Sequence, residues 1–309
     1  MIKCKVLSVT VFFILCIGII TASNDQEQLA VNLDYYDEVT LVNIYVTVTD
    51  NKNNFIRELL KEDFIVKEDG KVQQISHFSI ESPPLVVLLL MDGSGSMQEE
   101  VCKNLQKVDI AKNAALEFIK RFRPQDKYGI ITIEDYARVS CEPVSSTFEV
   151  KKELIFFEAK PRNTALYDAI YYASELLQKY PVSRKVIVIF SDGLDSASRV
   201  TFEEALNAAI AQDIAIFGFI TAKLTDRPSL RGYSTLDEIA KQTGGKLIIP
   251  STIEETDKKI NELEDELFNV YSIAYKPQKT NEKSSRFHKL DVKIIERNAK
   301  LRHKKGYIN

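Results

Sequence analysis

Histidine is scarce in this sequence, and its distribution argues against several kinds of enzyme. The three histidines, His77, His288 and His303, all lie outside the central region that holds the serines discussed below. A serine hydrolase needs a base beside its serine, and the sequence also has no Gly-x-Ser-x-Gly motif. We therefore expect no enzymatic activity. A metal-assisted hydrolase that uses Glu134 or Asp135 as a base is the weaker alternative.

The sequence also lacks an excess of positive charge and has only one long apolar run. The formal net charge of −3 argues against nucleic acid as the main partner. The apolar run, residues 6–22, follows Lys3 and Lys5 and ends in small residues, a pattern typical of a secretory signal. An uncleaved membrane anchor is the alternative, and no other stretch is long enough to span a membrane. We expect residues 1–23 to be a signal peptide and the mature protein to be secreted, periplasmic or on the cell surface.

Cysteine is rare as well. Two of the four cysteines lie in the expected signal peptide, which leaves Cys102 and Cys141. An oxidising compartment favours a disulfide between them. Two free thiols are the alternative, because the sequence does not show whether the two Cα atoms lie within bridging distance.

The remaining sequence divides into three regions by its hydrophobic pattern. Residues 24–82 and 271–309 show the one-faced alternation of antiparallel strands, as in Val42, Ile44, Val46 and Val48. Residues 83–270 instead alternate apolar strand patterns with helical ones, which predicts an α/β region with a doubly wound, mostly parallel sheet. Neither flank has enough strands for a stable sheet of its own. We therefore expect the two flanks to pair into one small β-sandwich.

Oxygen-bearing side chains follow two of the predicted buried strands. The apolar run 85–90 leads into Asp92, Ser94 and Ser96, and the run 186–190 leads into Asp192. Thr164 precedes a helical pattern. Carboxylates and hydroxyls suit a hard divalent cation, and ligands gather at the carboxyl ends of parallel strands. A simple turn built from Asp, Gly and Ser is the alternative for the first stretch.

This set of residues, Asp-x-Ser-x-Ser, then Thr, then Asp after a strand, resembles the metal-ion-dependent adhesion site of von Willebrand factor type A (VWA) domains. The resemblance implies that Asp92, Ser94, Ser96, Thr164 and Asp192 bind a metal ion. It also implies a doubly wound, Rossmann-like fold over residues 83–270. With its flanks and its Gly306-Tyr307 ending, the chain more loosely resembles the bacterial secreted group of VWA-related proteins. One departure is Asn163, where relatives commonly carry glycine, and it affects the geometry of the loop before Thr164.

The resemblance implies a non-enzymatic adhesion or protein-binding module. Its metal would be Mg²⁺, with Mn²⁺ or Ca²⁺ as alternatives, and an open coordination position would accept a Glu or Asp carboxylate of a partner protein. A structural scaffold with an unused metal site is the alternative. Asp92 has no basic neighbour in the sequence. We therefore expect Asp92 and Asp192 to repel each other when no ion is bound.

Overall fold

The computed structural model describes residues 41–80, 82–102, 104–181, 184–221, 227–250, 255–277, 286–295 and 298–308. The expected signal peptide, residues 1–23, lies outside these residues, and so does the side chain of Cys102, on which the expected disulfide depends. Within the described part of the chain, no helix combines the length and the apolar character needed to cross a membrane.

A six-stranded sheet forms the centre of the chain. Its strand order is β12-β11-β10-β5-β8-β9, and all neighbours are parallel except β8 and β9, which are antiparallel. The strands are β5 (Leu85–Asp92), β8 (Lys127–Ile133), β9 (Ala137–Val144), β10 (Arg184–Ser191), β11 (Ile214–Ile220) and β12 (Leu247–Ile248). All eight residues of β5 are buried, as expected for a strand covered on both faces.

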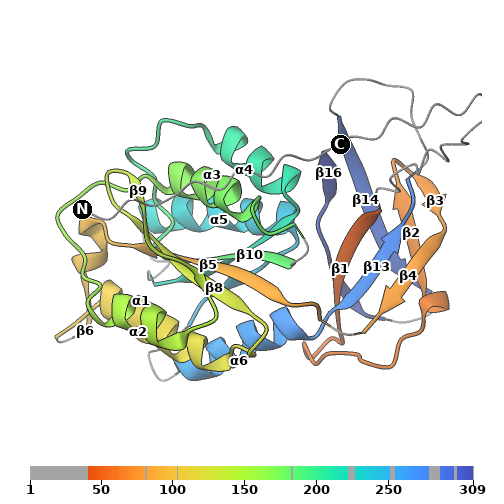
Figure 1. Cartoon of the computed structure of the whole chain (residues 1–309), viewed down its shortest axis with the longest axis horizontal. Coiled ribbons are helices and arrows are strands. Elements are labelled where there is room, and N and C mark those ends of the chain that lie inside the picture. The colour runs from red at the N-terminus through yellow and green to blue at the C-terminus, as the bar shows by residue number, and fades with distance from the viewer. Residues whose placement is uncertain are drawn as a thin grey trace, which may run out of the picture. The chain divides into compact units, whose positions relative to one another are not determined.

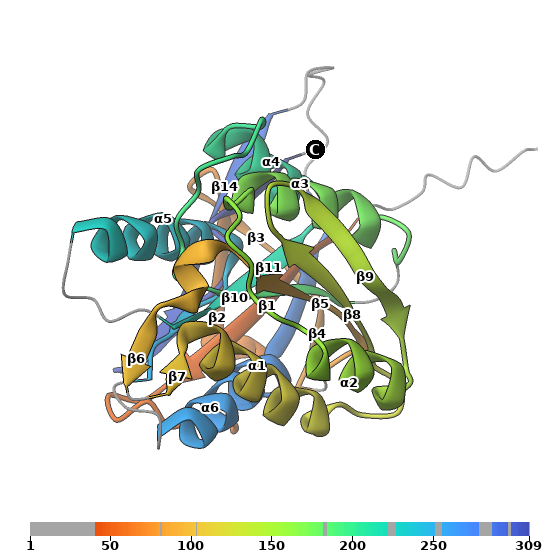
Figure 2. The same ribbon diagram turned by 90° about the vertical axis from the view of Figure 1, so that its left-hand side faces the viewer.

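Helices cover both faces of this sheet. Figures 1 and 2 show α1, α2 and α6 on one face and α3, α4 and α5 on the other. These helices are α1 (Lys107–Phe118), α2 (Thr147–Ile155), α3 (Leu166–Leu177), α4 (Phe202–Ala211), α5 (Arg227–Thr243) and α6 (Thr256–Phe268). One hydrophobic core lies on each face, so the doubly wound fold class is confirmed. After α5 the chain turns through Gly244, whose φ of 82° is typical of a helix C-cap.

The flanking regions form two further sheets that share one core. Their strand orders are β15-β1-β13-β4 and β16-β14-β2-β3, so each sheet combines strands from both ends of the chain, as expected for the sandwich. The strands are β1 (Val42–Thr49), β2 (Phe64–Glu68), β3 (Lys71–Gln73), β4 (Ile75–Ser79), β13 (Tyr271–Tyr275), β14 (Phe287–Ile294), β15 (Lys300–Arg302) and β16 (Gly306–Ile308). The sequence pattern predicts one strand over residues 72–78. That prediction is wrong, because the chain passes from one sheet to the other between β3 and β4.

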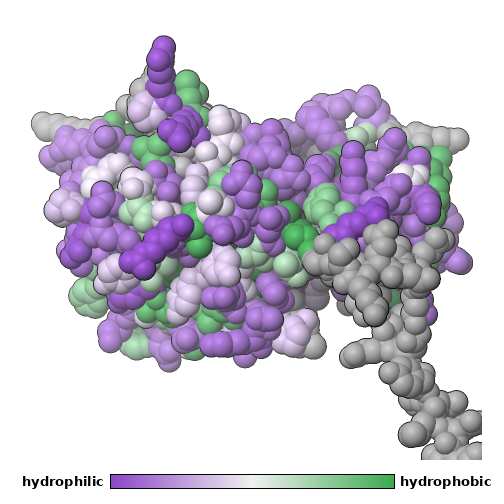
Figure 3. All heavy atoms as spheres, turned by 90° about the horizontal axis from the view of Figure 1, so that it is seen from above, coloured by the Kyte–Doolittle hydropathy of each residue, from purple (hydrophilic) through white to green (hydrophobic). Residues whose placement is uncertain are grey.

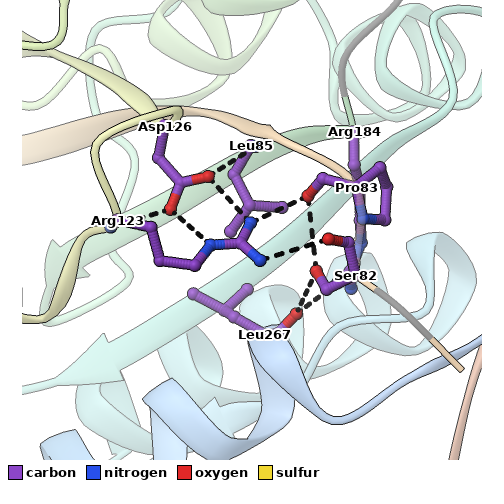
Figure 4. A network of polar contacts seen from close by, with 7 residues as sticks. All are labelled: Ser82, Pro83, Leu85, Arg123, Asp126, Arg184 and Leu267. Carbon is purple, nitrogen blue, oxygen red and sulfur yellow. Dashed lines mark hydrogen bonds and ion pairs between the residues drawn. The ribbon is translucent and has the colours of Figure 1, made fainter.

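A polar network fixes the point where the chain passes from the sandwich into the central sheet (Figure 4). The carboxylate of Asp126 is completely buried and accepts hydrogen bonds from the backbone N–H of Leu85 and from the guanidinium of Arg123. Arg123 also donates to the carbonyls of Ser82 and Pro83, at 3.1 and 2.9 Å. The network therefore satisfies backbone groups at the start of β5 that have no partner in the sheet.

Candidate metal centre

The first segment of the site is the turn that follows β5. Asp92 is the last residue of the strand, and its Oδ1 accepts a hydrogen bond from the backbone N–H of Ser94 at 3.0 Å. Ser96 lies in the short 3-10 helix η2 (Gly95–Gln98), with its Oγ 3.2 Å from that of Ser94. The turn thus folds the hydroxyls of both serines to the same side as the carboxylate of Asp92.

The second segment follows β10, which lies beside β5 in the sheet. Ser191 ends β10, and its Oγ donates a hydrogen bond to Oδ2 of Asp92 at 2.5 Å. Asp192 is the next residue and is 1% exposed. Because β5 and β10 are parallel neighbours, their carboxyl ends bring Asp92 and Asp192 to the same edge of the sheet, as the sequence predicts.

The third segment is the loop before α3, which carries Thr164. The carbonyl of Thr164 accepts hydrogen bonds from the backbone N–H groups of Ser196 and Ala197, at 2.9 and 3.0 Å. Two residues earlier, the carbonyl of Arg162 accepts from the N–H of Gly95 at 2.9 Å. This loop is therefore bonded to both other segments, and the five residues selected from the sequence gather at one edge of the sheet.

Lys107 changes the expected electrostatics of this edge. Its ammonium lies 3.3 Å from Oδ2 of Asp192 and 2.6 Å from Oε2 of Glu99. Burial alone lowers the pKa of Lys107, but Glu99 and Asp192 outweigh this effect and raise the pKa, so the lysine is charged. The sequence shows no basic neighbour of Asp92, and the structure adds Lys107, which α1 brings to Asp192 from 85 residues away in the sequence.

The two aspartates still affect each other. Burial, and then the negative charge of Asp192, raise the pKa of Asp92 to about 6, although the hydrogen bonds from Ser191 and Ser94 oppose the shift. A buried carboxylate of this kind gains most from a cation placed between it and its neighbour. Lys107 contacts Asp192 and supplies one positive charge to the pair.

The rim of the site is held by contacts with the turn between β8 and β9. Asn163 donates from its backbone N–H and from its side-chain amide to Oδ1 of Asp135, at 3.0 and 2.8 Å, so this residue anchors the loop before Thr164. Arg162 pairs with Asp135 at 3.1 Å and lies 3.9 Å from Glu134. These hydrogen bonds, the one from the Asn163 backbone first, lower the pKa of Asp135, which makes this residue a poor general base.

The donor set at the edge fits a divalent cation. It comprises two buried carboxylates and three hydroxyls, which are hard oxygen ligands of the kind that Mg²⁺, Mn²⁺ and Ca²⁺ bind. The ammonium of Lys107 on Asp192 shows that this edge already attracts a cation. When bound, such an ion would act as a Lewis acid that accepts an oxygen ligand from outside the protein.

The family comparison agrees with this geometry. Residues 87–194, which include all five site residues, match the family model of the von Willebrand factor type A domain. The chain contains a VWA domain. A search of curated proteins finds no match.

The chain is also similar to solved structures. A von Willebrand factor type A protein from Catenulispora acidiphila is similar to 89% of this chain and 75% of its own, at 13% identity and a TM-score of 0.50. An aerotolerance-related membrane protein from Bacteroides fragilis matches 59% of this chain and 98% of its own, at 19% identity and a TM-score of 0.48. The PilB minor pilin from Streptococcus sanguinis matches 60% and 61%, at 14% identity and a TM-score of 0.49.

A second polar cluster, not found from the sequence, lies in the sandwich. Nδ1 of His288 is 3.4 Å from Glu68 and 3.0 Å from Asp69. Both carboxylates already have protein donors, since Tyr275 donates to Glu68 at 2.6 Å and Arg286 pairs with Asp69 at 3.0 Å. We interpret the cluster as a structural network that fastens the β2–β3 hairpin to β14. In the sequence, the Asp69-Gly70 pair, which is typical of a β-hairpin turn, lies beside this cluster.

Proposed function

We propose that this protein is an extracytoplasmic, non-enzymatic protein-binding module whose VWA domain uses a divalent cation to capture an acidic side chain of a partner protein. The observation that carries the proposal is the gathering of Asp92, Ser94, Ser96, Thr164 and Asp192 at one edge of the sheet. Three of these five ligands are neutral hydroxyls. An ion held by them stays incompletely neutralised, so a Glu or Asp carboxylate from a partner forms a strong charge-assisted contact with it.

The exposed side chains of the domain bear on which partner this edge could bind. Over α3 and α4, hydrophilic and apolar residues are interspersed among the described residues of the face shown in Figure 3. Near the metal centre the side chains of Lys160 and Arg162 are 56% and 49% exposed, and Tyr136 is 60% exposed. Lys160 and Arg162 lie 4.0 and 3.1 Å from Glu134 and Asp135, so these charges largely offset one another, and the preference for an acidic partner rests on the metal ion. The extracytoplasmic location rests on the signal pattern in the sequence.

Calorimetry and thermal melting test the metal centre directly. We expect saturable binding of Mg²⁺ or Mn²⁺ by the wild type, weaker binding by Thr164→Ala and none by Asp92→Ala. Thr164→Ala removes one neutral hydroxyl whose place a water can take, whereas Asp92→Ala removes a charged ligand. At an ion concentration of 100 times Kd the wild type should gain about 2.7 kcal/mol in unfolding free energy. Asp265→Ala is the matched control, because it removes an exposed carboxylate on α6.

The partner chemistry needs its own test. Peptides with a central Glu and otherwise identical peptides with Gln are compared for binding to the wild type, with Mg²⁺ and with a chelator. We expect only the Glu peptides to bind, only with the metal, and not to Asp92→Ala. A wild-type protein without saturable metal binding would instead support the alternative of a structural scaffold. Metal binding with equal affinity for the Glu and Gln peptides would refute the capture of a carboxylate.

A further inference from the structure

Lys107 is a cation built into the candidate metal centre. It is the first residue of α1, and its side chain is only 10% exposed. Its ammonium contacts a buried candidate ligand, Asp192, on one side and Glu99, whose side chain is 66% exposed, on the other. One buried and one exposed carboxylate therefore share a single positive charge.

The backbone holds Lys107 in this position. The N–H of Lys107 donates to the carbonyl of Glu99 at 3.0 Å, which places the two residues side by side. Gln106, the residue before the helix, donates its N–H to the side chain of Asp109 at 2.9 Å, and this contact fixes the start of α1. The ammonium can therefore shift toward Glu99 by a change of side-chain rotamer, without movement of the helix.

A divalent cation bound through Asp192 would repel this ammonium. Like charges a few ångströms apart in a buried site interact strongly, because little water screens them. Two arrangements relieve the repulsion: the metal stays weakly bound, or the ammonium leaves Asp192. Glu99 offers a place for the ammonium, since it already accepts a shorter contact at 2.6 Å and is open to solvent.

We propose that Lys107 is a tethered counter-cation that contacts both Asp192 and Glu99 in the metal-free protein and keeps only its contact with Glu99 when a divalent cation binds. The proposal rests on the proposed metal-dependent function. Lys107 then stabilises the metal-free site and lowers its affinity for metal, while Glu99 raises that affinity by accepting the displaced ammonium. Lys107 and Glu99 thus set the ion concentration at which the protein becomes competent to bind its partner.

The test is a double-mutant cycle of Lys107→Met and Glu99→Gln, with Mn²⁺ and Mg²⁺ affinities measured by calorimetry. Lys107→Met should bind the ion on the order of 10-fold more tightly than the wild type, and it should melt at a lower temperature in chelator. Glu99→Gln should bind the ion more weakly than the wild type. In the Lys107→Met background the effect of Glu99→Gln should nearly vanish, because Glu99 acts through the ammonium.

Lys120→Met is the matched control for the loss of one positive charge. Lys120 is 59% exposed and pairs with Glu117, so we expect little change in metal affinity. The inference is overturned if wild type and Lys107→Met bind the ion equally, or if Glu99→Gln has the same effect in both backgrounds. Absence of binding by all variants would refute the proposed function as well, whereas wild-type binding without a Lys107 effect would refute the inference alone. If Lys107→Met does not fold, the Glu99→Gln comparison with the wild type still decides, since unchanged affinity there contradicts the proposal.

Discussion

Replacing Arg123 with methionine should be among the most destabilising changes of a partly exposed residue in this protein. The Arg123 side chain is 28% exposed, but its partner Asp126 has a side-chain exposure of 0%. Arg123→Met removes the two guanidinium contacts to Asp126, at 3.0 and 2.8 Å, and the hydrogen bonds to the carbonyls of Ser82 and Pro83. The buried carboxylate then loses its only cationic partner in the described network.

The structure sets the size of the effect. Removal of one partner from a buried ion pair costs about 3–5 kcal/mol, because it leaves an uncompensated buried charge. Asp126 keeps two backbone donors, the N–H of Leu85 at 2.9 Å and that of Arg123 itself at 3.0 Å. Methionine can also retain part of the packing of Arg123 on the ring of Phe268. We therefore place the loss of unfolding free energy near the lower limit, at about 3 kcal/mol.

Urea unfolding in the presence of a chelator measures this loss of unfolding free energy. Far-UV circular dichroism is used to follow the unfolding, because the chain has no tryptophan whose fluorescence could be used instead. Arg121→Met is the matched control. Arg121 lies two residues away and pairs with Glu264 at 2.9 Å, but both of these side chains are about 30% exposed. Its loss should cost less than about 1 kcal/mol. Equal costs for the two variants would refute the argument that burial of Asp126 determines the difference.

Two further predictions concern the sandwich. Deletion of residues 276–309 removes β14, β15 and β16. The amides of Val42–Val48 should then lose protection from hydrogen exchange, while the VWA domain stays folded. Unchanged protection would contradict a shared sandwich. Burial lowers the pKa of His303. Its Nε2 accepts a hydrogen bond from the N–H of Val292 at 3.3 Å, and its Nδ1 lies 2.6 Å from the carbonyl oxygen of Lys304. The unfolded chain therefore binds a proton at this residue more readily as the pH falls below about 6.5, so His303 lowers the stability of the fold between pH 7 and 5.5. Asp92, whose pKa is raised, acts in the opposite direction over this range, so the quantity to measure is the urea midpoint of the wild type minus that of His303→Gln. That difference should decrease as the pH falls, and a difference that does not change with pH would exclude a role for His303.

The sequence predicts the positions of Asp92 and Asp192, because the apolar patterns of two strands and the parallel arrangement of those strands together determine them. The unbroken apolar run of β5, and a second in β10, predicted two buried neighbouring strands, and the parallel arrangement then placed Asp92 and Asp192 at one edge. Lys107 could not be predicted in the same way. Its contact with Asp192 spans 85 residues of sequence and depends on where α1 begins.

Two other differences have local causes. Helix α2 cannot be predicted from the sequence, because only two of its residues, Val150 and Leu154, are buried, so its apolar pattern is too short to reveal a helical period. The separation of β3 from β4 cannot be predicted either, because an alternating pattern does not show which sheet each residue joins. Val72 is 66% exposed, although the alternation placed it at the start of one continuous strand.

The interleaved sandwich has a consequence for the order of events during synthesis. Strand β1 pairs with β13 and β15, strand β4 pairs with β13, and about 190 residues separate β4 from β13. At 5–20 residues per second, the first strands wait about 10–40 s for their partners after leaving the ribosome. Closing a flexible loop of this length would cost about 5 kcal/mol in chain entropy. A VWA domain that folds first removes most of this cost, because Ser82 and Leu267, near its two ends, lie within 3.5 Å of each other. The central domain thereby brings β13 and β4 together within the same chain.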